Sequence, residues 1–205
     1  MKDNVKLGED ADINARIAAR VRELRSDLGL SLEALSDKCG VSRSMISLVE
    51  RGESSPTAAV LQKIASGLLV PLAELFDDPA EPACPLSRRK GRKTWCDPGS
   101  GYTRRNISPA NFPSPMHIVE VTLPGGARIA YESAPGQSDM HQQVWVRRGR
   151  VEVCVGESTY HLAEDDCLAM RLGRSIAFTN RTRRPVRYIV VIARASGKSP
   201  PAAIS

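Results

Sequence analysis

The 205-residue sequence predicts a multidomain α + β fold, with a five-helix domain followed by an antiparallel β-barrel. Two observations support this fold class. Over residues 10–78, apolar residues recur at the three- and four-residue spacing of helices. From Met116 onward the apolar period becomes two, as in strands, and glycine, aspartate or proline marks the breaks. Residues 79–104, between these halves, are basic and contain several prolines, which predicts a linker.

The first helix is predicted to begin after Asp12, which suits an N-cap, and to end at Gly29. Its apolar residues follow the spacing of one helix face, which we expect to be buried. These residues are Ile13, Ile17, Val21, Leu24 and Leu28.

The second and third helices are predicted to begin at Ser31 and Ser42, two hydroxyl side chains of the kind that caps helices. Gly40 lies between them and can take the left-handed conformation that a tight turn needs. A helix, a tight turn and another helix form the helix-turn-helix arrangement. The residues expected to face inward are Leu32, Leu35, Met45, Ile46 and Val49.

The fourth and fifth helices complete the predicted helical domain. The fourth is expected to begin at Ser55-Pro56, with Val60, Leu61 and Ile64 buried. The fifth is the short segment PLAELF, which begins at Pro71.

The third helix carries hydroxyls and one arginine near its N-terminus. Packing of Ile46 and Val49 leaves Arg43, Ser44 and Ser47 pointing outward, together with Leu48. In DNA complexes this end of the second helix of the motif enters the major groove. Arginine can bind a guanine edge, serine can reach bases or phosphates, and apolar atoms can touch a thymine methyl. The alternative is a helical module for protein contacts, with a solvated serine face.

Residues 13–76 resemble the phage-repressor or XRE type of helix-turn-helix domain. The matching stretches are RVRELRSDLGLSLEALSDKCGVS, SRSMISLVERGESSP and LQKIASGLLVPLAELF. The resemblance implies a transcriptional regulator that binds a double-stranded DNA operator as a homodimer. By position it implies base contacts for Arg43, Ser44 and Leu48, with Ser42 and Ser47 nearby, and phosphate contacts for Ser31 and Arg51. It also implies a structural ion pair between Arg25 and Glu50.

Three leucines depart from the family pattern. Leu32 stands where the family often has a DNA-contacting glutamine, and Leu48 replaces a frequent polar reader. Leu69 replaces the usual glycine before the last helix, and we expect Gly67 to absorb that turn instead.

The net charge of +6 is unevenly distributed along the chain. Residues 1–78 carry −3, residues 79–105 carry +5, and residues 106–205 carry +4. Any DNA-binding face near the N-terminus must therefore be a local arrangement. The basic run SRRKGRK, residues 87–93, is either a solvated linker or a source of phosphate and minor-groove contacts.

The second half contains the stretches QVWVRRGRVEVCVGESTYHLAEDDCLAMRLGRSIAFTN and RPVRYIVVIAR. With these stretches, residues 105–195 resemble a cupin, a small β-barrel, and residues 196–205 are expected to form a disordered tail. Cupins usually hold a metal with histidines and a glutamate, ligands whose lone pairs converge on one ion. The matching positions here are Gly136, Ser138, Gln142 and Ile176, so we expect no metal and no cofactor. His141 could join such a site only through a one-residue bulge, because a regular strand points it to the other face.

A barrel of this size can hold one small molecule. In regulators that look like this one, the cupin half is taken as a sensor and a dimerisation surface, which implies an unidentified small-molecule effector. Strand parity predicts the pocket residues, although all of them could simply be core: Met140, Gln142, Val144, Met170, Ile176 and Phe178.

The sequence therefore predicts a sequence-specific transcriptional regulator and not an enzyme. The alternatives are a metal-dependent cupin enzyme with a DNA-binding appendage, and an antitoxin-like interaction module. The N-terminus lacks the apolar stretch of a signal peptide, so we expect a cytoplasmic protein. The cysteines lack metal-like spacing. We expect Cys39, Cys154 and Cys167 to be packed in the interior and Cys84 and Cys96 to be exposed.

Overall fold

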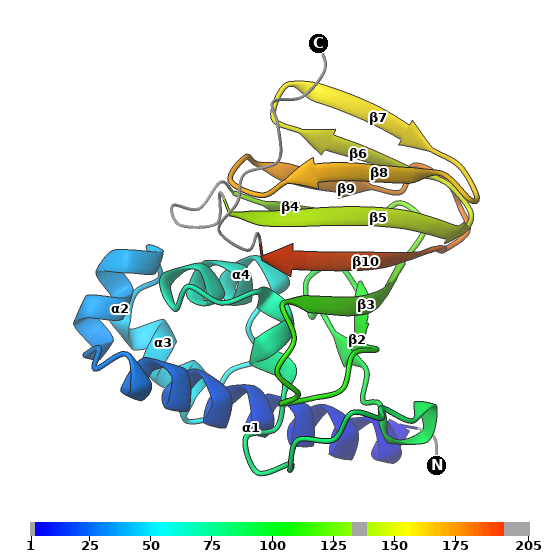
Figure 1. The fold of residues 1–205 in the computed structure, drawn as a ribbon. Coiled ribbons are helices and arrows are strands. Elements are labelled where there is room, and N and C mark those ends of the chain that lie inside the picture. Colours follow the sequence, from blue (N-terminus) through cyan, green and yellow to red (C-terminus); the bar gives the residue numbers. More distant parts are fainter. Residues whose placement is uncertain (1–2, 133–138, 195–205) are drawn as a thin grey trace.

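The structure, a computed structural model, describes residues 3–132 and 139–194, with side chains from residue 13 onward. A helical domain comes first, and two antiparallel sheets stack above it (Figure 1). The helices described are α1 Asp3–Asp27, α2 Leu32–Cys39, α3 Arg43–Glu50, α4 Ala58–Gly67 and the 3-10 helices η1 Leu72–Phe76 and η2 Arg89–Gly91. The strands described are β1 Trp95–Cys96, β2 Thr103–Asn106, β3 Met116–Leu123, β4 Arg128–Tyr131, β5 Met140–Arg148, β6 Val151–Val155, β7 Ser158–Leu162, β8 Cys167–Arg171, β9 Ile176–Thr179 and β10 Val186–Arg194.

Helix α1 is longer than the apolar pattern predicts. It begins at Asp3, so the predicted N-cap at Asp12 is wrong, because the helical backbone continues through it. The predicted stop is confirmed, since Gly29 takes a left-handed φ of 63° just after the helix. Leu28 lies past the last helical residue and is 47% exposed, so it leaves the buried face of α1.

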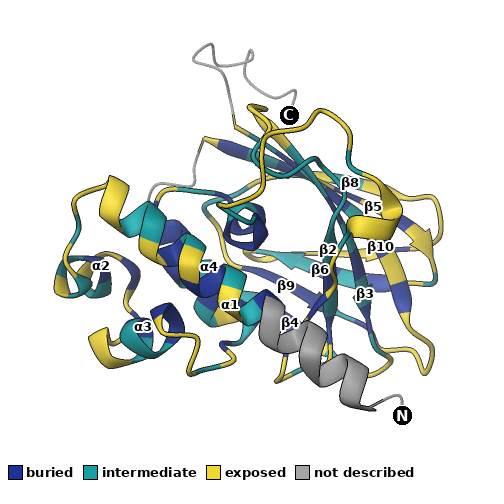
Figure 2. Ribbon diagram, turned by 90° about the horizontal axis from the view of Figure 1, so that it is seen from below, coloured by how far each residue is buried: buried dark blue, intermediate teal, exposed yellow. Residues whose placement is uncertain are grey.

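The turn between α2 and α3 is as predicted. The Ser31 hydroxyl accepts a hydrogen bond from the Ala34 amide at 3.0 Å, and the Ser42 hydroxyl accepts one from the Met45 amide at 3.3 Å. Gly40 has a φ of 66°. Buried residues line the centre of the helical domain, and exposed residues gather on the outer side of α2 and α3 (Figure 2). Leu35, Ile46 and Val49 are buried, whereas Leu32 and Met45 are only partly so.

Helix α4 begins later than predicted and ends differently. Its N-cap is Thr57, so the predicted start at Ser55-Pro56 is wrong. The prediction that Gly67 absorbs the following turn is also wrong, because Leu69 itself takes a left-handed φ of 60°. Gly67 has another role: a Cβ there would lie 2.7 Å from the Cys39 Cβ, so glycine lets α4 approach α2 closely.

The fifth predicted helix is a 3-10 helix, so the domain has four α-helices in its described part and not five. In η1 the Glu74 amide donates to the Pro71 carbonyl three residues back, which is the 3-10 pattern. The segment has only five residues, and Pro71 fixes its start.

The β domain consists of two antiparallel sheets. One sheet has the order β1-β2-β3-β10-β5-β8 and the other β4-β9-β6-β7. The predicted closed barrel is not observed, because the described strands pair within these two separate sheets. The predicted alternation holds along β5, where Met140, Gln142, Val144 and Val146 are buried and the residues between them are more exposed.

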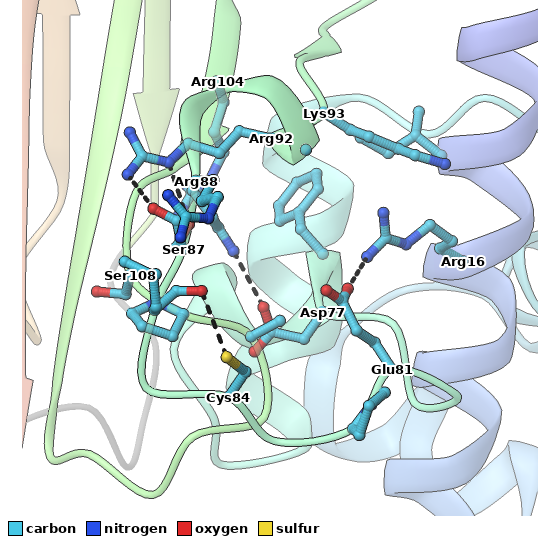
Figure 3. A pocket seen from close by; sticks show the side chains of 18 residues that line it. Arg16, Asp77, Glu81, Cys84, Ser87, Arg88, Arg92, Lys93, Arg104 and Ser108 are labelled. Carbon is cyan, nitrogen blue, oxygen red and sulfur yellow. Dashed lines mark hydrogen bonds and ion pairs between the residues drawn. The ribbon is translucent and has the colours of Figure 1, made fainter.

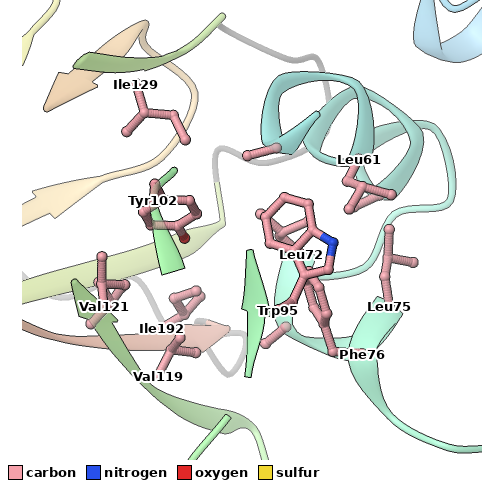
Figure 4. Packing of buried hydrophobic residues seen from close by; sticks show 14 of the residues in the cluster. Leu61, Leu72, Leu75, Phe76, Trp95, Tyr102, Val119, Val121, Ile129 and Ile192 are labelled. Atoms are coloured by element: carbon pink, nitrogen blue, oxygen red, sulfur yellow. The ribbon is translucent and has the colours of Figure 1, made fainter. Parts of the chain in front are cut away.

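The segment predicted as a linker, residues 79–104, contributes to the core. It contains β1 and the start of β2, both in the six-stranded sheet. Trp95 and Tyr102 are each 2% exposed, and the Trp95 ring centroid lies 5.4 Å from that of Phe76 in η1 (Figure 4). The buried core therefore runs without a break from the helical domain into the β domain.

Hydrogen bonds tie the two domains together as well. Asp97, after β1, accepts a bond from the Ala58 amide at the start of α4, at 2.7 Å. The Asn106 amide group donates to the Ala73 carbonyl at 2.8 Å, and the Arg194 guanidinium donates to the Leu69 carbonyl at 2.6 Å.

Candidate nucleic-acid interface

One face of helix α3 is buried against the helical domain, and the other is exposed to solvent. Its Ile46 and Val49 are 0% and 1% exposed, and they pack against the other helices of the domain. Its N-terminal residues Arg43 and Ser44 are exposed. The first turn of α3 therefore projects from the domain on a rigid base.

An ion pair fixes the C-terminal end of α3 to α1. Arg25 Nε lies 2.6 Å from one Glu50 carboxylate oxygen, and Nη2 lies 2.8 Å from the other. The bond to Glu50 raises the pKa of Arg25 further above its already high value. Arg22 also donates to the Glu50 carbonyl at 2.6 Å, and Arg25 reaches the Leu30 carbonyl at 2.8 Å. This bidentate geometry orients α3 as well as attaching it.

Four exposed side chains predicted to contact DNA lie at the N-terminal ends of α2 and α3. Ser31 and Ser42 use their oxygens as helix caps, so each hydroxyl keeps a proton that it can donate to a phosphate. Ser44 lies beside Ser42, with 3.2 Å between the two hydroxyl oxygens. Arg43 lies 3.9 Å from the Glu33 carboxylate, and both side chains are 68% exposed.

The remaining predicted contacts lie one turn further along α3. Ser47 and Leu48 are partly exposed. Arg51 donates to the Ser47 hydroxyl and makes two bonds of 2.9 Å to the Glu53 carboxylate. These bonds raise the pKa of Arg51 and lower that of Glu53. A phosphate would have to compete with Glu53 for Arg51, and likewise with Glu33 for Arg43. Neither glutamate is predicted from the sequence motif.

The basic run, residues 87–93, lies near the first described side chains of α1. Arg88 and Arg92 line a surface cavity of about 490 Å³ opposite Arg16 of α1 (Figure 3). Arg92 also bonds to Ser87 at 2.8 and 3.1 Å. The run therefore lies at the surface of the domain junction, with Arg88, Arg89, Lys90 and Lys93 exposed.

Four of the six residues predicted for an effector pocket line one cavity. Met140, Gln142, Ile176 and Phe178 line a narrow cavity of about 60 Å³ between the sheets, whereas Val144 and Met170 do not. Other lining residues lay outside the prediction. They include Tyr102 and Arg104 from the predicted linker and Gln62, Pro71 and Leu72 from the helical domain.

The described residues hold no cluster of three or more side chains of the metal-ligating kind. Positions 136 and 138 of the cupin pattern lie outside the described residues. The pairing of β5 with β10 is regular at His141, so the bulge that would turn it inward is absent there. No helix among the described residues is long and apolar enough to cross a membrane.

Three of the five cysteines lie as predicted. Cys39 is buried, and Cys84 and Cys96 are exposed. Cys154 is partly exposed, and the prediction that Cys167 is packed in the interior is wrong. Cys167 begins β8, at the edge of the six-stranded sheet, on the outward side of the strand.

Comparison with known proteins places this geometry among DNA-binding regulators. Residues 21–75 match the helix-turn-helix family. The chain is 30% identical over 139 residues to the HTH-type transcriptional regulator SutR of Escherichia coli, covering 68% of this chain and 72% of that protein. It is 25% identical over 175 residues to the E. coli regulator PuuR, covering 83% and 90%.

A solved structure is similar over almost the whole chain. It is the crystal structure of an HTH_3 family transcriptional regulator from Vibrio cholerae, with a TM-score of 0.73 and 25% identity. The match covers 91% of this chain and 99% of that one. The similarity therefore includes the β domain as well as the helices.

Proposed function

Because the chain belongs to the helix-turn-helix family of transcriptional regulators, we propose that it reads a DNA operator as a homodimer and senses a small molecule in its β domain. The observation that carries the proposal is the open first turn of α3, held on a buried base by the Arg25–Glu50 pair. Arg43, Ser44 and Leu48 are the base-reading residues in this proposal. Ser31, Ser42, Ser47 and Arg51 contact phosphates or support those that do.

The geometry of DNA half-sites supports the homodimer. One α3 is short, so it covers only a few base pairs of the major groove. Two copies related by a twofold axis would place two such helices about 34 Å apart, one turn of B-DNA. The operator should then be an inverted repeat with its half-sites about 10 base pairs apart.

Sensing is supported by where the cavity lies. Its wall includes Gln62, Pro71 and Leu72, which belong to the segment that follows α3 in the helical domain. A ligand there would contact both domains at once. It could favour one arrangement of the paired α3 helices over another, to the extent that it binds the two arrangements with different affinity. The regulator names of both bacterial relatives support a non-enzymatic role.

The test is selection from a random DNA pool with the full-length protein. We expect an enriched site with twofold symmetry, because each subunit contributes the same α3. An enriched site without symmetry would contradict the homodimer while leaving DNA reading in place. Enrichment of no sequence at any salt concentration would contradict the operator-binding role itself.

A further inference from the structure

Arg104 is a buried arginine without an ion-pair partner among the described residues. It lies on β2, is 6% exposed, and its Nε and Nη2 atoms make no hydrogen bond there. No carboxylate among the described residues forms an ion pair with it. Its neighbour on the other face of β2, Arg105, is by contrast paired with Glu120.

The buried carboxylates of the domain junction are already engaged. Asp97 accepts bonds from the amides of Ala58 and Ser100, each at 2.7 Å. Asp77 accepts a bond from Asn106 at 3.3 Å. The only observed compensation for Arg104 among the described groups is the Phe76 ring, whose centroid lies 5.1 Å from the guanidinium carbon.

An unpaired buried charge is costly, and proteins normally pair it or bind a counter-ion. A cation over an aromatic ring offsets only part of that cost. The site is therefore electrostatically incomplete without an anion.

The space next to Arg104 suits an anion that carries a small apolar group. Arg104 lines the cavity between the sheets together with Gln142, Tyr131 and Tyr188. Burial raises the pKa of both tyrosines well above the usual value. Tyr131 also hydrogen-bonds to Tyr102, so the Tyr188 hydroxyl is the one that we expect to donate to an anion. Met140, Ile176 and Phe178 supply the apolar part of the wall.

We propose that this cavity binds a small organic acid, with its carboxylate on Arg104 and its short apolar chain between the sheets. The inference rests on the proposed sensing function and gives it a ligand class. The narrow volume of about 60 Å³ favours a short acid over a large one. Bound there, the acid would touch Leu72 of η1 and so bear on the DNA-binding domain.

Calorimetric titration and thermal shift test this with acetate, isobutyrate and isovalerate as probes. The neutral control is isobutyramide, which matches isobutyrate in shape, and the inorganic control is sulfate. We expect the branched acids to bind and raise the midpoint of unfolding, with isobutyrate at least about tenfold tighter than its amide. Equal binding of acid and amide, or binding of none of the three acids, would overturn the proposal.

Two variants locate the anion. Arg104→Met should reduce acid binding by at least about tenfold while leaving the ligand-free midpoint equal or higher, because it removes an unpaired buried charge. Arg88→Met is the matched control, since Arg88 lines only the surface cavity at the domain junction, which Arg104 also borders. Loss of acid binding in Arg88→Met with retention in Arg104→Met would place the anion in the surface cavity and overturn the proposal.

Operator selection separates this inference from the proposed function. A protein that enriches a symmetric DNA site but binds none of the acids retains its role as a regulator and loses its proposed ligand class. A protein that binds isobutyrate through Arg104 but enriches no DNA keeps the anion site and loses the proposed function.

Discussion

Single residues carry strain in the turn after α4. Leu69 takes a left-handed φ of 60° and is 52% exposed, so it has the backbone cost without the gain of burial. A left-handed conformation costs an L-residue about 1–2 kcal/mol, and glycine adopts it freely. The left-handed backbone at position 69 thus explains why the family usually has glycine there.

We expect Leu69→Gly to raise the free energy of unfolding by about 1 kcal/mol, measured by urea denaturation. Leu28 is the matched control, because it is 47% exposed and does not have a positive φ. Leu28→Gly should lower the stability instead. A loss of stability in both variants would show that Leu69 makes a contact worth more than its backbone strain.

A second prediction for a single residue concerns Asp77 and the dependence of stability on pH. Its pKa is raised by burial, against the opposing influence of His117, Asn106 and Arg20. The folded state therefore keeps this proton at pH values where the unfolded chain has lost it, and the stability from this group falls as pH rises through that interval. Asp77→Asn, which cannot ionise, should gain stability over the wild type as pH rises from about 3 to 7.

Thermal unfolding of both proteins across that pH range measures the difference. A stability difference that shrinks as pH rises would mean that the ionised Asp77 is stabilised by His117 and Arg20 by more than burial costs it.

At the residue scale, an interaction could be predicted where the family pattern gives both of its residues. The Arg25–Glu50 pair is of that kind, because the family places both residues. Arg104 gave no such signal, since it lies among other arginines in a segment that resembles a linker. Only the strand pairing of β2 shows that Arg104 points inward and Arg105 outward.

At the scale of elements, α4 depends on a group outside its own domain. Its N-terminus is capped by Thr57 from within and by Asp97 from the strand region. A carboxylate at a helix N-terminus accepts a hydrogen bond from an otherwise unpaired amide and interacts favourably with the positive end of the helix dipole. Asp97 thus joins the start of α4 to β1.

We expect Asp97→Ala to lower the free energy of unfolding by about 2 kcal/mol, because the bond to the Ala58 amide is charge-assisted and buried. Thr57→Ala is the control, with an expected loss of about 1 kcal/mol from an ordinary cap. Chemical denaturation of both variants provides the comparison. Equal losses would show that Asp97 acts as no more than a local cap.

The elements that could be predicted were those with a cap and a glycine at their ends. Ser31, Gly40 and Ser42 mark α2 and α3 unambiguously. The start of α1 could not be predicted, because no cap among the described residues marks it, and the 3-10 form of η1 could not, because a five-residue segment can form either kind of helical turn. The alternation of side chains along β5 predicted that Met140 and Gln142 line the cavity. It could not predict how far along the strand the cavity extends.

At the scale of the whole molecule, the two domains share one core. Phe76 and Leu72 of η1 meet Trp95 and Tyr102 of the strand region in a continuous buried cluster. Composition alone predicted a linker over residues 79–104, because prolines and charges outnumber the few buried aromatics in that segment. Those aromatics decide its structure.

We expect the protein to unfold in one cooperative transition, because separating the domains would expose Trp95 and its apolar neighbours to water. Differential scanning calorimetry tests this by comparing the calorimetric and van't Hoff enthalpies, which should agree. Two resolved transitions would mean that the domains are stable apart and that the segment acts as a tether.

The affinities of wild type and Arg43→Ala for the selected operator and for a random duplex decide whether α3 reads bases. If Arg43 reads a base edge as proposed, the variant should lose about tenfold to a hundredfold on the operator and little on the random duplex. Arg51→Ala, the phosphate-contact control, should weaken both by a similar factor. An equal loss for Arg43→Ala on both DNAs would contradict base reading by α3.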